Sequence, residues 1–289
     1  MNNQDWEILD QLSRHLNITK AAENMQLSQS TITKRLKQME AGFDVRIVFR
    51  GKKGIHFTPE GEYLADSARS ILKEYEVMKD TLWNMEEEVK GTIKIAVSNF
   101  LTSFLLFNVI RAFKEKYPEV DFQITTGWSR DMYDQVRNDD VHVSFIRGDY
   151  QWQGRKHLLF EETLCIASKQ PIPLAELPAS PRIDYKKDIK LDTMISSWWD
   201  VNFREVPRIS MVMDKAESCR EMIRNGLGYS IVTSLVVRNM EDIHKTELKD
   251  REGQLIRRGS WMFYHEKSLK LKAVRKFVEF IESYDPSRG

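Results

Sequence analysis

Residues 59–89 constrain the fold of this chain more than any other segment, because they carry one helical pattern with no breaker after Gly61. Thr58 and Pro59 provide a helix start, with a capping hydroxyl followed by a first-turn proline. Apolar residues then recur in alternating steps of 4 and 3, which places them in one narrow stripe on a rod of about 46 Å. So narrow a stripe predicts a linker helix that dimerises, since a helix lying on its own domain would need a wider apolar face. The stripe consists of Leu64, Ala68, Ile71, Tyr75, Met78, Leu82, Met85 and Val89.

The segment before this helix, residues 1–58, contains three short helical patterns followed by two short strand patterns. Ser28 is a good N-cap for the third helix. Within that helix, Ile32, Leu36 and Met39 are spaced to form a buried stripe, and polar residues occupy a different face. A short polar face at the start of a helix, set on a small partner helix with an Ala-Ala pair, predicts a helix-turn-helix that enters the major groove of double-stranded DNA.

The two strand patterns, VRIVFR and IHFT, flank the basic turn GKKG and predict a β-hairpin wing. Residues 29–53 hold seven basic side chains against two acidic ones, which is the charge distribution expected of a phosphate-facing surface. A solvated helix face without a partner would also contain Lys, Gln and Ser. The Ser28 cap, the Ala-Ala pair and the wing favour a DNA-binding face instead. The residues expected to contact DNA are Gln29, Ser30, Thr31, Thr33, Lys34, Arg35, Lys37, Arg50, Lys52 and Lys53, with Arg35, Lys37, Arg50, Lys52 and Lys53 mainly on phosphates.

From Gly91 onward, short β-rich runs alternate with amphipathic helical patterns, which is typical of an α/β domain with a largely parallel sheet. After the first run, TIKIAV, a polar segment at 98–103 leads into a helix. Hydroxyls and free backbone N–H groups at the positive end of a helix suit an anion. Arg147 follows the strand VHVSFI, at the corresponding end of a neighbouring strand, where ligands of open α/β sheets bind.

Composition restricts the setting in which the protein works. The 44 Lys and Arg residues balance 43 Asp and Glu residues. The resulting net charge of +1 for the whole chain does not by itself identify a class of partner. Cys165 and Cys219 are too few for a disulfide framework and fit a reducing compartment. The N-terminus has no basic segment followed by an apolar run, and the longest uncharged run, residues 95–110, has 16 residues, against about 20 for a membrane span. We therefore expect a cytoplasmic protein that does not bind membranes.

No constellation of catalytic residues is recognisable in the sequence. The six histidines contain no i, i+4 pair and neither cysteine lies in a CxxC motif, so we expect no metal site. The GLG at 226–228 lies between a helix and a strand, the wrong order for a nucleotide site, so we expect no cofactor. Trp198 and Trp199 could stack on an aromatic ligand, although packing is commoner. The alternative function is that of a solute-binding or lyase-like enzyme domain with an accessory helix-turn-helix. Turnover of a candidate ligand would support this alternative, whereas binding to promoter DNA without turnover would support a regulator.

The run TKAAENMQLSQSTITKRLKQME, together with Arg50 and FTPEG, resembles the N-terminal signature of LysR-type transcriptional regulators. The resemblance implies a cytoplasmic DNA-binding regulator that forms a homodimer and, from pairs of dimers, a homotetramer. It also implies an α+β winged helix-turn-helix, a long linker helix, and an α/β effector domain of two lobes that resembles a periplasmic binding protein. The implied ranges are 1–58 for the winged domain, 59–90 for the linker, 91–289 for the effector domain, 91–162 and 263–289 for lobe I, and 163–262 for lobe II.

The chain departs from the family pattern at several positions. Asn17 stands where glycine is usual before the second helix, Asp44 where glycine is usual before the wing, and Val48 where phenylalanine is usual. In the effector domain, His142 stands where an aspartate is common and Thr233 where a proline is common. These departures concern the geometry of the wing and of the ligand cleft.

In the resembled family, the junction at 98–103 lines the ligand cleft, and Arg257 or Arg258 precedes the strand WMFY, which is expected to cross between the lobes. Because arginine binds a carboxylate through two parallel hydrogen bonds, these groups predict a site for a small anionic di- or tricarboxylate. A weaker resemblance, to the citrate-responsive catabolite control branch of the family, implies citrate as the ligand. It rests on the runs IRGD, ESCREMIRNGLG, LIRRGSWMFY and KLKAVRKFVEFI. The alternative is that Arg147 pairs with Asp149 or another surface acid and that Arg257 is solvated. The expected effector-binding residues are Ser98, Asn99, Phe100, Thr102, Arg147 and Arg257.

Overall fold

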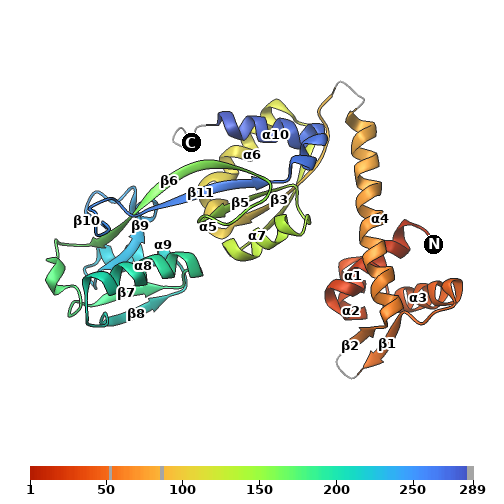
Figure 1. Ribbon diagram of the computed structural model, residues 1–289, viewed down its shortest axis with the longest axis horizontal. Helices are drawn as coiled ribbons and strands as arrows, with labels where there is room; N and C mark the ends of the chain where they lie inside the picture. The colour runs from red at the N-terminus through yellow and green to blue at the C-terminus, as the bar shows by residue number, and fades with distance from the viewer. Residues whose placement is uncertain (52–53, 85–87, 285–289) are drawn as a thin grey trace. The chain divides into compact units, whose positions relative to one another are not determined.

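The structure, a computed structural model, consists of two compact units (Figure 1). Lys52, Lys53 and Met85, which the sequence assigned to the wing and to the apolar stripe, lie outside the residues that it describes. In the described part of the chain, no helix is both long and apolar enough to cross a lipid bilayer. The units are Met1–Glu87 and Glu88–Gly289, and the described residues are 1–51, 54–84 and 88–284.

The first unit is the predicted winged helix-turn-helix, followed by the long helix α4. Its hairpin is antiparallel, with Val48 opposite Phe57 and Gly51 opposite Gly54. The elements are α1 (Asn3–His15), α2 (Ile18–Asn24), α3 (Gln29–Phe43), β1 (Val48–Gly51), β2 (Gly54–Phe57) and α4 (Pro59–Asn84).

Polar side chains fix where the helices of this unit begin. Ser28 Oγ accepts a hydrogen bond from the backbone N–H of Thr31 at 3.1 Å, and Thr58 Oγ1 accepts one from Gly61 at 2.9 Å. Both predicted N-caps are therefore confirmed. The side chain of Asn17 caps α2 in the same way, at 3.1 Å, so the departure from glycine at this position supplies a helix cap.

The buried face of α3 packs into the core of the first unit. Ile32, Leu36 and Met39 are buried in one cluster with residues of α1, the hairpin and α4. Leu16, which continues the apolar face of α1, is instead 47% exposed, because it ends that helix in the left-handed conformation with φ 48°. Its carbonyl oxygen accepts a hydrogen bond from the N–H of Ile55 at 2.9 Å, so the backbone holds the wing against the end of α1.

The apolar stripe of α4 is buried only over its first turns. Leu64 and Ala68 belong to the core cluster of the first unit, so the alternative in which the helix lies on its own domain holds for this part. From Ile71 to Leu82, the stripe faces solvent within the unit, and the exposed fractions of Met78 and Leu82 reach 52% and 57%. Within the described residues of the unit, this part of α4 has an unpartnered apolar face.

The long helix also ends earlier than the pattern predicts. Its described part runs to Asn84, residues 85–87 lie outside the described residues, and residues 88–90 are not helical. The prediction of a helix to 89 is therefore wrong. Val89 packs against the core of lobe I, just before Gly91, at φ 123°, leads into a strand. The apolar residue at this position serves the core of the following domain, and its match to the helical spacing is coincidental.

The second unit contains two lobes, each with its own hydrophobic core. In lobe I, β3 lies between β4 and β5 and is parallel to both, and β11 runs antiparallel to β5. The elements of this lobe are β3 (Gly91–Ser98), α5 (Asn99–Leu101), the π-helical turn η1 (Thr102–Leu106), α6 (Phe107–Lys116), β4 (Val120–Gly127), α7 (Ser129–Arg137), β5 (Val143–Arg147), β6 (Arg155–Ser168, shared with lobe II), β11 (Arg257–Tyr264), η4 (Glu266–Lys270) and α10 (Lys272–Ser283).

Helices cover both faces of the lobe I sheet, which explains the continuous apolar run in β3. Ile93, Ile95 and Val97 pack in a cluster with α6 and α10, whereas Ala96 packs in a second cluster with α7. Figure 1 shows α6 and α10 on one side of the sheet and α7 on the other. Because β3, β4 and β5 are parallel, their carboxyl ends lie at one edge of the sheet.

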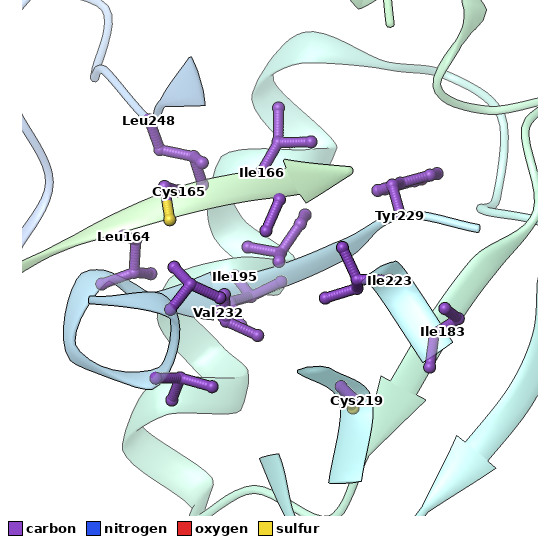
Figure 2. Close-up of a cluster of buried hydrophobic side chains, with 14 of the residues drawn as sticks. Leu164, Cys165, Ile166, Ile183, Ile195, Cys219, Ile223, Tyr229, Val232 and Leu248 are labelled. Carbon is purple, nitrogen blue, oxygen red and sulfur yellow. The ribbon is translucent and has the colours of Figure 1, made fainter. Parts of the chain in front are cut away.

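Lobe II has a core built from β6, β9, α8 and α9. Figure 2 shows Leu164 and Ile166 of β6 beside Val232 of β9, with Ile195 from α8 and Ile223 from α9 in the same cluster. Trp198 and Trp199 are buried in this cluster, and their indole N–H groups donate to backbone carbonyls, so they pack and do not stack on a ligand. The elements are η2 (Leu174–Glu176), β7 (Arg182–Tyr185), α8 (Ile189–Asn202), β8 (Ile209–Met213), α9 (Ala216–Arg224), β9 (Ser230–Thr233), η3 (Ser234–Val237) and β10 (His244–Glu247).

Two long strands, β6 and β11, connect the lobes. Up to Thr163, β6 pairs with β11, and from Leu164 it pairs with β9. On β11, Ser260 already pairs with β5 of lobe I, and Met262 lies in the lobe I core. The return crossing therefore precedes Ser260, earlier than the predicted boundary at 262/263, because the ladder with β5 begins before the apolar part of the strand.

The buried cap of α4 yields a stability prediction. Thr58 Oγ1 also donates to the carbonyl of Arg46 at 2.6 Å, so it joins the start of α4 to the wing. Thr58→Ala should lower the free energy of unfolding of the first unit by about 1–2 kcal/mol, measured by denaturant titration of the full chain. Thr58→Ser, which keeps the hydroxyl, should recover most of this loss, and equal loss in both variants would show that the cap does not stabilise the helix.

Candidate functional site

The first candidate site is the exposed face of α3. Ser30, Lys34 and Lys37 are exposed, and Thr31 and Thr33 are partly exposed. These side chains lie apart from the buried face of the same helix, as the spacing predicted. The face therefore presents hydroxyl and ammonium groups, which can contact base edges and phosphates.

Hydrogen bonds already order the beginning of this face. Gln29 Nε2 donates to Thr19 Oγ1 of α2 at 2.9 Å, which links the two helices of the helix-turn-helix. The hydroxyl of the Ser28 cap lies 2.7 Å from Ser30 Oγ and 2.8 Å from Thr31 Oγ1. The polar groups that lead α3 are thus held in a defined arrangement before any partner binds.

Arg35 differs from the other basic residues of the α3 face. Its Nη1 donates to Asp5 Oδ1 at 2.7 Å and to Asn2 Oδ1 at 3.1 Å, and the side chain is 26% exposed. Asn2 and Asp5 form the capping box of α1. Arg35 therefore ties α3 to the start of α1, a structural role that the sequence did not indicate.

The wing supplies the rest of the basic surface. The guanidinium of Arg46 lies over the ring of Phe49, with 4.7 Å to the ring centroid, and Phe49 is 49% exposed. Arg50 lies in β1 opposite Ile55, but its side chain, like Lys52 and Lys53, lies outside the described residues.

The second candidate site is a cavity of about 450 Å³ at the junction of the two lobes. Five of the six predicted effector-binding residues line it, which places the polar junction after β3 and the end of β5 at one site. Its walls also include residues at the ends of β7 and β8. The predicted residues that line the cavity are Ser98, Asn99, Phe100, Thr102 and Arg147.

The sixth predicted residue, Arg257, does not line the cavity. Arg257 is exposed, whereas Arg258 is 2% exposed and lies in the cavity wall. Successive side chains of a strand point to opposite faces, so one of these neighbours must point inward and the other outward. The prediction that Arg257 lines the cleft is therefore wrong, and its neighbour Arg258 occupies the cavity wall.

Four helical segments begin at the cavity, which concentrates backbone N–H groups around it. The N-cap residues of α5, α7, α8 and α9 all contribute to its walls. Of these four, only Asp188, the N-cap of α8, caps its helix with a side chain. No side chain caps the starts of α7 and α9, so their first backbone N–H groups can donate to an anion. Each helix also has an acidic residue in its first turn, Asp131 in α7 and Glu217 in α9, and Glu217 lines the cavity. The four N-caps are Ser98, Trp128, Asp188 and Lys215.

Two buried arginines form the floor of the cavity. Arg147 Nη2 donates to Glu162 Oε1 and, at 3.0 Å, to Thr233 Oγ1. Arg258 Nη2 donates to Asp188 Oδ2, and Arg258 stands directly opposite Glu162 in the β6–β11 ladder. Burial, followed by repulsion from Arg147, lowers the pKa of Arg258. The two guanidiniums and two carboxylates form a buried, compensated set of charges.

Several polar atoms of the floor have no hydrogen-bond partner among the described residues. They are buried, and an unpartnered buried polar group is costly. A ligand with anionic oxygens would satisfy the donors among them. The unpartnered atoms are Ser98 Oγ, Arg147 Nε, Glu162 Oε2, and Arg258 Nε and Nη1.

The surroundings of Arg147 also correct the alternative considered for it. Arg147 does not pair with Asp149, which binds Lys156 at 2.7 Å; its acidic partner is the buried Glu162. The guanidinium of Arg147 also lies over the ring of Phe100, 3.8 Å from the centroid. These contacts fix its orientation in the cavity wall.

Residues of lobe II that the sequence did not indicate complete the cavity. Asp188 follows β7, and Lys215 follows β8, each directly before a helix. Ser129 begins α7 after β4 in the same way. The signal that identifies Ser98, a polar residue between a strand and a helix, is also present at these positions.

The other chemistry that the sequence raised finds no support in the described residues. Among them, no group of three or more His, Cys, Asp or Glu residues is placed to hold a metal ion. Burial raises the pKa of the Cys165 thiol to about 12 and that of Cys219 to about 11, which makes both thiols poor nucleophiles. His142, one of the departures, accepts a hydrogen bond from the N–H of Lys94 through Nδ1 at 3.1 Å. This structural contact joins β3 to the residue that precedes β5.

Sequence profiles of two families match the chain. The profile of the bacterial regulatory helix-turn-helix protein, lysR family, matches residues 3–62, and that of the LysR substrate binding domain matches residues 86–285. Two relatives from Bacillus subtilis (strain 168) are the uncharacterized HTH-type transcriptional regulators YraN and YkuM. YraN is 36% identical, with 98% of each chain covered; YkuM is 31% identical, with 98% of this chain and 97% of the relative covered.

Solved structures of full-length regulators share the fold. A full-length OxyR variant from Pseudomonas aeruginosa has a TM-score of 0.66 at 16% identity, with 100% of this chain and 97% of that chain covered. The virulence activator AphB of Vibrio cholerae, a member of the LTTR family, has a TM-score of 0.62 at 16% identity, with 99% and 100% covered. Full-length CbnR in complex with its target DNA has a TM-score of 0.61 at 21% identity, with 97% and 99% covered.

Proposed function

The chain belongs to the LysR family of transcriptional regulators, and on that premise we propose that it reads promoter DNA as a homo-oligomer under the control of a small carboxylate. It is a DNA-binding regulator with an effector-binding domain, and not an enzyme. The alternative of a solute-binding or lyase-like enzyme is therefore set aside. Because its proposed target is promoter DNA, the proposed place of action is the cytoplasm.

The ordered polar face of α3 supports the proposed mode of DNA reading. Its exposed hydroxyl and ammonium groups lie on one side of the helix, away from the core. In this proposal, the side chains that contact base edges or nearby phosphates are those of Gln29, Ser30, Thr33 and Lys34, whereas Lys37 contacts mainly phosphates. The wing adds phosphate contacts from Arg50, Lys52 and Lys53.

Oligomer formation is proposed for the exposed part of the α4 stripe. Ile71, Tyr75, Met78 and Leu82 are 39–57% exposed and follow one another at helical spacing. A second copy of the helix would cover this face, and a dimer would present two α3 helices to two half-sites. Pairing of such dimers into a tetramer is part of the same proposal.

The carboxylate effector is supported by the cavity floor and walls. Unpartnered donors on Ser98, Arg147 and Arg258 lie at the same cavity as the uncapped ends of α7 and α9 within the described part of the chain. The unpartnered guanidinium atoms are the observation that carries the proposal, because arginine matches the planar geometry of a carboxylate. The predicted resemblance to the citrate-responsive branch makes citrate the first ligand to test.

The proposed division of roles in DNA binding has a direct test. Gln29→Ala should reduce discrimination between operator and unrelated DNA, with a loss of roughly 1–3 kcal/mol on the operator. Lys37→Ala should weaken binding to both DNAs alike and reduce the slope of log K against log salt by about 1. Fluorescence anisotropy at several salt concentrations measures both effects. An altered sequence preference in Lys37→Ala with an unchanged salt slope would contradict this division.

The dimer proposal predicts the effect of a charge in the stripe. Met78→Asp would place an unpaired carboxylate in the interface, which is costly, so sedimentation should show monomers and operator affinity should fall. Lys73→Asp introduces an acid on the same helix at an exposed position outside the stripe, and it should leave the oligomer intact. Unchanged oligomerisation in Met78→Asp would refute the assignment.

The effector proposal predicts saturable binding of citrate or a related di- or tricarboxylate to the full chain, measured by calorimetry. Ser98→Ala removes one unpartnered donor without changing the fold and should weaken binding about tenfold. Arg257→Gln, which alters the exposed neighbour of Arg258, should bind as the wild type does. If no di- or tricarboxylate binds, or if Arg147→Gln binds unchanged, the proposed effector class is wrong.

A further inference from the structure

We propose that Asp188 is a built-in competitor of the effector: its carboxylate occupies Arg258 in the ligand-free protein, and a carboxylate of the ligand must take its place. This inference rests on the proposed function of the cavity as an anion site. It makes Asp188 a residue that sets ligand affinity and connects binding to lobe II.

The two oxygens of Asp188 have separate roles. Oδ1 accepts a hydrogen bond from the backbone N–H of Leu191 at 3.1 Å and caps α8, whereas Oδ2 accepts from Arg258 Nη2. The side chain of Arg258 is 1% exposed and that of Asp188 is 14% exposed. Asp188 therefore helps to cover Arg258 at the cavity, and a ligand reaches the guanidinium only when the carboxylate moves.

Arg258 has more hydrogen-bonding capacity than Asp188 uses. Its Nε and Nη1 are buried without a partner among residues 1–51, 54–84 and 88–284, and Nε of the neighbouring Arg147 is in the same state. A planar carboxylate can accept two parallel hydrogen bonds from one guanidinium, but Asp188 receives only the bond from Nη2. A free carboxylate, which is not tied to a helix start, can approach Arg258 in the bidentate geometry.

Asp188 also resembles a ligand group in its position. Of the four N-cap residues at the cavity, it alone carries a carboxylate, and it alone caps its helix with a side chain. The starts of α7 and α9 lie at the same cavity, and no side chain caps them. Asp188 therefore differs from the other acidic residues that line the cavity, Asp214 and Glu217, in that its carboxylate both caps a helix and binds a buried arginine.

Replacement of Asp188 by a ligand carboxylate at Arg258 removes a contact between lobe II and the connecting strands. Asp188 belongs to lobe II through α8, whose residues Leu191 and Ile195 are buried in the lobe II core. Arg258 belongs to β11, a strand shared by both lobes. Releasing their ion pair frees the start of α8 from the connecting strands, so a ligand carboxylate changes how lobe II is held.

Asp188→Asn in the full chain separates the charge from the cap, because asparagine is an equally good N-cap. Removing the competitor should raise citrate affinity by at least about tenfold in calorimetry, since the site no longer has to open first. Asp214→Asn is the matched control: Asp214 also lines the cavity, but its pair with Lys186, at 2.6 Å, is exposed. This control should change affinity by less than about twofold.

A second measurement does not depend on the identity of the effector. Asp188→Asn leaves the buried Arg258 without its acid, which lowers stability, and a small free carboxylate should replace it. Acetate should therefore raise the melting temperature of Asp188→Asn relative to chloride at equal ionic strength. It should have no such effect on the wild type or on Asp214→Asn. If Asp188→Asn does not fold alone, acetate or citrate should restore folding.

The outcomes distinguish this inference from the proposed function. If Asp188→Asn binds citrate no more tightly than the wild type, or if acetate neither stabilises nor restores it, Asp188 does not compete for Arg258. If the wild type and Asp188→Asn bind no di- or tricarboxylate but acetate selectively stabilises Asp188→Asn, the effector class is wrong and the competition at Arg258 stands.

Discussion

The ladder between β6 and β11 is the constraint on which the effector domain depends. Both cores are built onto these strands, since β11 pairs with β5 in lobe I and the end of β6 pairs with β9 and β10 in lobe II. Between the two cores, Glu162 and Arg258 stand opposite each other on these strands, and Arg147 reaches them from the end of β5. The fold thus creates a place, between two hydrophobic cores, where buried polar side chains can meet a ligand.

Charges at such a place must be balanced within the protein. A buried ion pair adds little net stability, but loss of one partner leaves an uncompensated charge and is strongly destabilising. The set of two arginines with Glu162 and Asp188 meets this requirement without a ligand. Thr233 adds a neutral acceptor for Arg147 at 3.0 Å, which a proline at that position would lack. This departure from the family pattern therefore supplies a contact to an arginine of the cavity wall.

Structural features that depend only on residues close together in the sequence could be predicted. The Ser28 cap, the buried stripe of α3 and the hairpin follow from spacing and turn chemistry, and the structure has them. What depends on distant residues could not be predicted. Whether Arg257 or Arg258 faces inward depends on which face of β11 meets the cavity, and the partner of Arg258 lies 70 positions away. The apolar spacing predicted that the long helix extends to Val89. This prediction failed because Val89 packs against the core of lobe I, so its match to the helical spacing does not reflect a helix.

The contact between Gln29 and Thr19 has a consequence for how this side chain would meet a base. One N–H of the Gln29 amide already donates a hydrogen bond, at 2.9 Å, before DNA arrives. The amide has a second N–H and an oxygen acceptor, so Gln29 can keep this bond while it contacts a base edge. Because the side chain is ordered before binding, less conformational entropy is lost when it meets a matching base. On a mismatched base, the same contact holds the amide in place, and its remaining polar groups face an edge that they do not match.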